Sequence, residues 1–175
     1  MADVTYLNRG KQTGGAPALP AGQSSAVHCL MIPLSNDILL LPNAAIAEVA
    51  AYQQLDAIAD APDWYLGKYS WRDYQVPVIA FELLTGNDDV NITVGKNSRI
   101  AILNTLNGNM NLPYIGIMVQ GIPRLQVVQS KAIEENASSS NRKSAYVADF
   151  VLMNGEPVTI PNIDMIERAI MDLTL

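Results

Sequence analysis

The side chains that could catalyse a reaction are few in this sequence of 175 residues, which contains one histidine and one cysteine. The two are neighbours, His28 and Cys29, inside an apolar stretch. Adjacent side chains of a strand point to opposite faces, so they cannot form a catalytic pair while the strand persists. We therefore interpret them as a packed or edge histidine and a buried thiol.

The sequence also lacks groups that would hold a metal ion or a phosphate. Zinc needs several converging histidine, cysteine or carboxylate ligands, and one histidine with one cysteine falls short. Residues 87–91 are polar and acidic but lack the alternating spacing and closing glutamate of a calcium loop. Residues 116–121 have glycines at a P-loop-like interval, without the Gly-Lys-Ser/Thr that completes that motif. We predict no metal, no cofactor and no catalytic site.

Residues 64–77, WYLGKYSWRDYQVP, form the most unusual segment of the chain. Tryptophan, tyrosine and arginine are the side chains that most often anchor protein interfaces. Arg72 is flanked by polar residues where a turn is expected, so we predict that its guanidinium presents its donors to solvent. The two tryptophans could instead fill the core, and for Trp64 this alternative stays open.

The composition disfavours several classes of partner. Lysine and arginine number 11 against 17 aspartates and glutamates, for a net charge of −6, and the longest basic feature is the pair at 142–143. Nucleic acids and anionic membranes are bound largely through clustered cations, so we predict neither partner. A single cysteine fits a reducing compartment. With no signal peptide pattern and no apolar run of about 18 residues, we expect a soluble cytoplasmic protein.

Short apolar stretches alternate with tight polar turns, a pattern typical of small barrels built from hairpins. Asn107-Gly108 and Asn154-Gly155 are hairpin signals. Residues 1–25, rich in glycine, proline and serine, predict a flexible tail before one folded region, residues 26–175. Strands are expected at 27–34, 38–41, 76–81, 99–105, 112–119, 125–128, 146–153 and 157–160, with residues 52–75 largely irregular.

Two helices are expected, together with one helical turn at 82–85. The first helix spans 44–51 after the capping residue Asn43, with Glu48 pointing away from its apolar face. The second spans about 162–173, and its apolar stripe predicts that it has a structural role at the core. Its apolar stripe is Ile163, Ile166, Ala169, Ile170 and Leu173, and the residues outside the stripe are Asp164, Glu167, Arg168 and Asp172.

An ordered series of motifs in this chain resembles the CheW-like domain. The family pattern of glycine, arginine turn and Pro-Val is matched by Gly67, Arg72, Pro77 and Val78. The remaining matches are Ile46-Ala47-Glu48-Val49, residues 116–122, Tyr146, Asn154-Gly155 and residues 162–166. The departures are Asp73 for a glycine, Ala80 and Gln120 for aspartates, and Asp149 for a glycine. Aspartate tolerates left-handed backbone, so we expect the turn to survive at Asp73.

The resemblance implies a mainly β fold of two five-stranded SH3-like barrels that share a hydrophobic interface, with a short helix after the second strand and a C-terminal helix. It implies a non-catalytic adaptor with two partners, the regulatory domain of a CheA-type histidine kinase and the cytoplasmic tip of a methyl-accepting chemoreceptor. It assigns Glu48 and Arg72 to partner-binding surface, and we expect neither to support the fold. The departures suggest a divergent member that serves type IV pilus motility.

Two other functions compete with the adaptor. A stand-alone barrel that binds a small ligand is favoured only if the aromatic segment 64–77 lines a pocket. An enzyme with an unrecognised site is the third hypothesis, and the single histidine and the lack of clustered polar groups argue against it.

Overall fold

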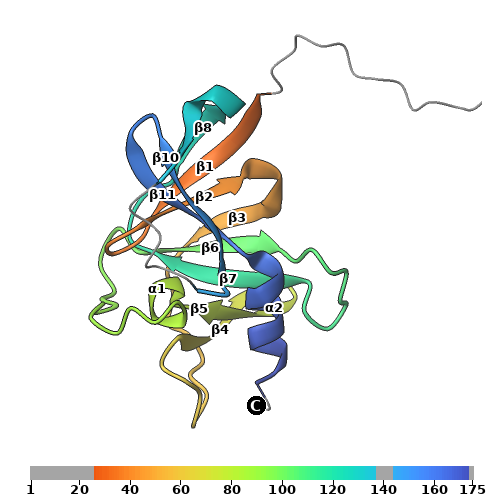
Figure 1. The fold of residues 1–175 in the computed structure, drawn as a ribbon. Coiled ribbons are helices and arrows are strands. Elements are labelled where there is room, and N and C mark those ends of the chain that lie inside the picture. Colours follow the sequence, from red (N-terminus) through yellow and green to blue (C-terminus); the bar gives the residue numbers. More distant parts are fainter. Residues whose placement is uncertain (1–25, 137–143, 174–175) are drawn as a thin grey trace, which may run out of the picture.

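The computed structural model describes residues 26–136 and 144–173, and within these ranges the chain forms two sheets, each curled around its own apolar core (Figure 1). The predicted tail, residues 1–25, lies outside the described residues. The first barrel has strand order β8-β1-β2-β11-β10-β9 and the second β3-β6-β7-β5-β4. The resemblance implied five strands in each barrel, and the first has a sixth, the three-residue β9.

The elements have the following bounds. In the first barrel, the strands are β1 (Val27–Pro33), β2 (Ile38–Pro42), β8 (Arg124–Val128), β9 (Ile133–Glu135), β10 (Val147–Met153) and β11 (Glu156–Pro161). In the second, they are β3 (Ile46–Ala51), β4 (Tyr65–Trp71), β5 (Tyr74–Ile79), β6 (Arg99–Asn104) and β7 (Tyr114–Val119). The helices are η1 (Asn43–Ala45), α1 (Phe81–Leu84), η2 (Ser130–Ala132) and α2 (Ile163–Met171).

A shared core lies between the two barrels. Strand side chains alternate between two faces, so the central strands serve two cores at once. In β6, Ile102 belongs to the interior of the second barrel, while its neighbour Leu103 belongs to the shared core. In β1, Met31 and Ile32 divide in the same way for the first barrel. This double burial explains why the strands are apolar at nearly every position.

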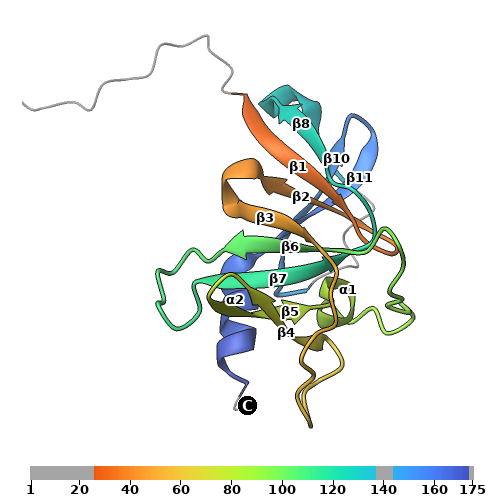
Figure 2. The same ribbon diagram turned by 180° about the vertical axis from the view of Figure 1, so that it is seen from behind.

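Helix α2 covers the shared core, and both views show it lying along the second barrel (Figures 1 and 2). Asn162 caps it by accepting a hydrogen bond from Met165 N at 3.2 Å. Ile163, Ile166 and Ile170 are buried in the shared core, as the predicted stripe requires. Glu167, which was predicted to lie outside the apolar stripe, is also buried, with 3% of its surface exposed. Its carboxylate accepts from Leu106 N at 2.6 Å and from Asn107 Nδ2 at 2.8 Å, and these bonds make its burial tolerable.

The segment after β2 departs from the expected helix. A short helix does follow β2, but it is the 3-10 turn Asn43–Ala45. The predicted continuation to Ala51 is wrong, because Ile46–Ala51 forms β3 and pairs antiparallel with β6. Cross-strand pairing thus overrides the local helical pattern. The expectation of irregular structure at 52–75 is also wrong in its second half, where Tyr65–Trp71 forms β4.

The two hairpin signals have different outcomes. Asn154 and Gly155 both have positive φ, 52° and 84°, and close the tight β10–β11 hairpin as predicted. Asn107 and Gly108 also lie in a hairpin connection, between β6 and β7. That connection runs from residue 105 to 113, so it is much longer than a two-residue turn.

Candidate protein-interaction surface

The second barrel closes along a seam between β3 and β4, the two ends of its strand order. Asp56, which follows β3, exchanges two backbone hydrogen bonds of 2.9 Å with Lys68 of β4. Side chains continue the closure: Tyr69 Oη donates to Ala51 O at 3.2 Å. Trp71 Nε1 donates to Glu48 Oε2 at 2.9 Å. The seam therefore brings Glu48, on β3, to the start of the β4–β5 turn.

Glu48 and Arg72 are brought together at the end of this seam. Arg72 Nη2 lies 3.3 Å from Glu48 Oε2, and the side chains are 65% and 43% exposed. The guanidinium carbon also lies 4.3 Å from the ring centroid of Trp71, a cation–π distance. The predicted exposure of both residues is confirmed, whereas their mutual contact had no signal in the sequence.

Two tyrosines extend this arrangement. Tyr74, 44% exposed, and Tyr114 meet edge to face with centroids 4.9 Å apart. Tyr114 also meets the ring of Trp71 edge to face at 4.9 Å. We call Glu48, Trp71, Arg72, Tyr74 and Tyr114 the anchor cluster. Tyr114 was missed in the sequence because the parallel pairing of β5 with β7, which brings it here, has no local signature.

The backbone holds the arginine in a strained position. Trp71 pairs with Tyr74 across a two-residue turn, and the positive φ falls on Arg72, at 51°. The turn expected to survive at Asp73 is present, and its positive φ falls on Arg72 because tight hairpins need positive φ at their first loop residue. Left-handed backbone costs a side-chain-bearing residue about 1–2 kcal/mol. Such strain is a recurrent feature of functional sites.

Tyr69 makes the seam sensitive to alkali. Burial, with the nearby Glu48 charge as a smaller cause, raises the pKa of Tyr69 above its usual value. The protonated phenol therefore stabilises the fold below about pH 10, and this contribution is lost as pH rises through the folded-state pKa. We expect the melting temperature of Tyr69→Phe to fall less steeply than that of the parent above about pH 10. Thermal melts across an alkaline series test this, and equal slopes would contradict it.

Another exposed apolar surface lies on β1 and β8. Leu125 and Val127 are 60% and 47% exposed, and they pair across the strands with Leu30 and His28. Leu30 packs at the margin of the shared core, so this face continues that core beyond the point where the second barrel covers it. We call these four residues the β1–β8 face; Figure 2 shows β1 crossing above β3. Exposed apolar patches of this kind mark interaction sites.

The predicted separation of His28 from Cys29 is confirmed. His28 is exposed, while Cys29 is 6% exposed and packs inside the first barrel. Burial raises the pKa of the Cys29 thiol, which disfavours the reactive thiolate. Among the described residues, no group of three or more histidine, cysteine or carboxylate side chains could hold a metal ion. Within the same ranges, no helix is long and apolar enough to cross a membrane.

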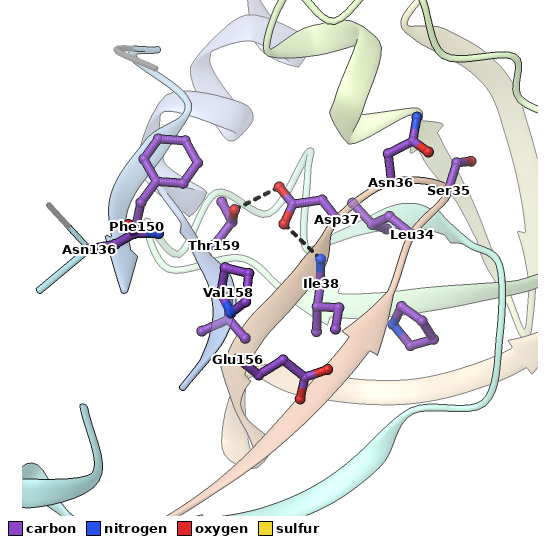
Figure 3. A pocket seen from close by; sticks show the side chains of 12 residues that line it. Leu34, Ser35, Asn36, Asp37, Ile38, Asn136, Phe150, Glu156, Val158 and Thr159 are labelled. Atoms are coloured by element: carbon purple, nitrogen blue, oxygen red, sulfur yellow. Dashed lines mark hydrogen bonds between the residues drawn. The ribbon is translucent and has the colours of Figure 1, made fainter. Parts of the chain in front are cut away.

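The hollows of the molecule do not favour a small-ligand function. A hollow of about 690 Å³ lies between the β1–β2 turn and the β10–β11 hairpin, away from segment 64–77 (Figure 3). Of the polar side chains that line it, Asp37 already accepts hydrogen bonds from Thr159 Oγ1 and Ile38 N, both at 2.7 Å. Segment 64–77 contributes Tyr65, Lys68, Gln75 and Pro77 to another hollow of about 240 Å³, below the 300–1,000 Å³ typical of ligand sites. It contributes Trp64 alone to a further hollow of about 560 Å³, whose other lining residues are Asp63 and five residues between 83 and 92.

Trp64 and Trp71 have different environments. Trp71 is 6% exposed and packs inside the second barrel, with its indole nitrogen at the seam. Trp64 is partly buried and packs against the shared core, so the core-filling alternative holds for it.

Comparison with known proteins defines the class. The model of the CheW-like domain family matches residues 28–170. The crystal structure of the scaffolding protein TtCheW from Thermoanaerobacter tengcongensis is similar, with a TM-score of 0.66 and 17% identity over 84% of this chain and 91% of that one. The comparison with curated proteins gave no match.

The fold is thus that of a scaffold built from two SH3-like barrels. The chain belongs to the CheW-like domain family, whose members are non-catalytic scaffolds of chemotaxis signalling.

Proposed function

We propose that this protein is a cytoplasmic adaptor that couples a CheA-type histidine kinase to methyl-accepting chemoreceptors. The observation that supports this most directly is the anchor cluster, in which an exposed arginine is held by a carboxylate and an indole. Such an arrangement suits recognition, because the guanidinium loses little conformational freedom when a partner binds.

The anchor cluster offers a defined chemistry to a partner. Among the described residues, the one hydrogen bond of the Arg72 guanidinium is that of Nη2 to Glu48, and the side chain is 65% exposed. Its other donors face outward and match a carboxylate, since the guanidinium fork binds carboxylates in a bidentate manner. Tyr74 supplies a half-exposed ring beside it. The fitting partner surface therefore has an acidic residue next to an apolar one.

The β1–β8 face suits a helical partner such as the chemoreceptor. Leu30, Leu125 and Val127 give it apolar surface beside the junction of the two barrels, with His28 at its margin. An amphipathic helix can lay its apolar side on such a surface, with anchors spaced by three or four residues. The cytoplasmic tip of a helical chemoreceptor is a partner of this kind, and we assign the receptor to this face.

Substitutions in the anchor cluster test the proposal. Arg72→Ala should weaken binding of a kinase or receptor fragment by about 2–5 kcal/mol if the partner buries the guanidinium, and by much less if the guanidinium stays at the rim. The free energy of unfolding should stay within about 0.5 kcal/mol of the parent, because the ion pair is exposed. Isothermal titration calorimetry and thermal melts give the two quantities.

Glu48 needs a more conservative change, because it also supports the seam. Glu48→Ala leaves the part-buried indole N–H of Trp71 without its acceptor, which costs about 1–3 kcal/mol. The expectation that Glu48 does not support the fold is therefore replaced by an expected loss of stability in Glu48→Ala. Glu48→Gln keeps an oxygen for the indole and removes the charge that holds Arg72. Normal binding of both fragments by Arg72→Ala and Glu48→Gln would rule out the anchor cluster as partner surface.

The pathway served by the adaptor is a separate question. We propose type IV pilus motility, on the ground that the chain departs from the family pattern at Asp73, Ala80, Gln120 and Asp149. Deleting the gene should abolish twitching on surfaces and leave swimming unchanged. Loss of swimming with normal twitching would assign the protein to the flagellar pathway instead.

A further inference from the structure

Glu82 is a buried carboxylate that the anchor cluster does not use. It lies on the short helix α1 of the second barrel and is 4% exposed. Both of its oxygens accept hydrogen bonds from the β1–β2 turn of the first barrel: Oε1 from Asn36 N at 2.7 Å, and Oε2 from Ser35 N at 3.1 Å. Glu82 therefore joins the two barrels by two charge-assisted bonds.

Among the described residues, the two bonds from the β1–β2 turn are what compensates for the burial of the Glu82 carboxylate. The ion pairs between described residues are Arg72–Glu48 and Arg124–Glu156, so no basic side chain in that part of the chain neutralises it. A charge removed from water is costly unless it is hydrogen-bonded. Its own backbone is fixed, because Glu82 O accepts from Thr85 Oγ1 at 2.9 Å and from Asn87 N at 3.0 Å. The carboxylate is thus held at a set position on the second barrel.

The β1–β2 turn, whose amides bond to Glu82, is also hydrogen-bonded to the rest of the first barrel. Asp37, the next residue, accepts from Thr159 Oγ1 of β11 at 2.7 Å. Figure 3 shows this bond beside Ser35 and Asn36. Any rotation of the first barrel against the second must therefore stretch the bonds to Glu82 or break them.

The β1–β2 turn and the β1–β8 face lie at opposite ends of β1. Leu30, which pairs with Leu125, is five residues from Ser35, a distance of roughly 17 Å along an extended chain. Because both carboxylate oxygens are bonded to successive amides, the pair of bonds fixes the direction of the turn as well as its position. Without them, a tilt of about 10° at the turn would displace the β1–β8 face by about 3 Å over that length. A surface that must match a helix is sensitive to displacements of this size.

We propose that Glu82 is a positioning residue: its carboxylate locks the β1–β2 turn to the second barrel and so fixes the β1–β8 face in the orientation that binds a partner helix. The effect of Glu82 on partner binding rests on the proposed adaptor function, whereas its role in fixing the two barrels does not.

The relative orientation of the barrels is measured directly by residual dipolar couplings of the full-length, ¹⁵N-labelled chain in a weakly aligning medium. Couplings from both barrels of the parent should fit one alignment tensor. In Glu82→Ala they should require two tensors, with the smaller amplitude for the first barrel. Glu82→Gln retains one acceptor oxygen and should be intermediate; it also serves if the alanine variant fails to fold. Glu134→Gln, which removes a charge from an exposed position on β9, should match the parent.

The second measurement is the affinity for the receptor fragment. Loss of the lock leaves only a fraction of molecules in the binding orientation, and the apparent Kd rises by the inverse of that fraction. We expect an increase of about three- to tenfold for Glu82→Ala, a smaller one for Glu82→Gln, and none for Glu134→Gln.

A single tensor for both Glu82 variants would overturn the lock. Two tensors with unchanged affinity would overturn its role in binding. A parent that binds neither fragment would refute the proposed adaptor function, and the couplings would still decide whether Glu82 fixes the barrels.

Discussion

Gly67→Ala is expected to lower the free energy of unfolding by about 3 kcal/mol or more, the largest effect that we expect from alanine at any glycine of the described residues. Gly67 lies in β4, directly before the residue that pairs with Asp56 at the seam. A Cβ atom there would lie 2.6 Å from the carbonyl oxygen of Asp56 and 3.2 Å from Leu55 Cβ. The first contact is with backbone, which has no rotamer to escape into.

The conformation of Gly67 adds to this clash. Its φ is +132°, a value that side-chain-bearing residues rarely adopt. Relief would require β4 to move away from the segment after β3, which would open the second barrel and part Trp71 from Glu48. We therefore expect Gly67→Ala to weaken partner binding as well as stability.

Two other glycines serve as controls. Gly95→Ala meets no atom within 4 Å and has no positive φ, so it should melt like the parent. Gly108→Ala also meets no atom, but its φ is +63°, so it isolates the cost of backbone strain, about 1–2 kcal/mol. Chemical denaturation of the three variants gives the comparison. A Gly67→Ala protein as stable as Gly95→Ala would show that the seam is not close-packed.

Ile166→Ala is expected to cost about 2–5 kcal/mol, because it leaves a cavity where three layers meet. Ile166 has no exposed surface and lies on α2 in the shared core. Partners in that core come from both barrels, for example Leu39 of β2 and Ile117 of β7. The barrels cannot close onto the cavity without losing their own alignment. Met171→Ala, on the same helix but 52% exposed, should stay within about 0.5 kcal/mol of the parent.

Removal of the whole helix extends this test. Truncation before Asn162 strips Ile163, Ile166 and Ile170 from the shared core, each worth about 1.5–3 kcal/mol of burial. We expect an insoluble or molten product, visible as loss of dispersed amide signals in an NMR spectrum. A truncated chain that melted at the parent temperature would contradict a structural role for α2.

The sequence contained the features that depend on near neighbours. Turn chemistry at Asn154-Gly155 predicted a tight hairpin, and a spacing of three and four apolar residues predicted α2. Polar flanks predicted an exposed Arg72, and the ordered motifs predicted the CheW-like fold. The turn, helix and exposure signals are readable because the atoms responsible for them lie within a few residues along the chain, whereas the fold was implied by resemblance to a known family.

The remaining features depend on partners far away in sequence. Residues 46–51 look helical locally, but they become a strand because β6 offers an edge to pair with. Most of the paired residues are more than fifty positions apart in the sequence. Glu82 and Glu167 look like surface carboxylates and are buried, because backbone amides 46 and 61 residues away satisfy them. Arg72 reaches its partner Glu48 across a separation of 24 residues, through barrel closure. Hydrogen-bond partners and pairing edges are properties of the assembled fold, and no window of sequence contains them.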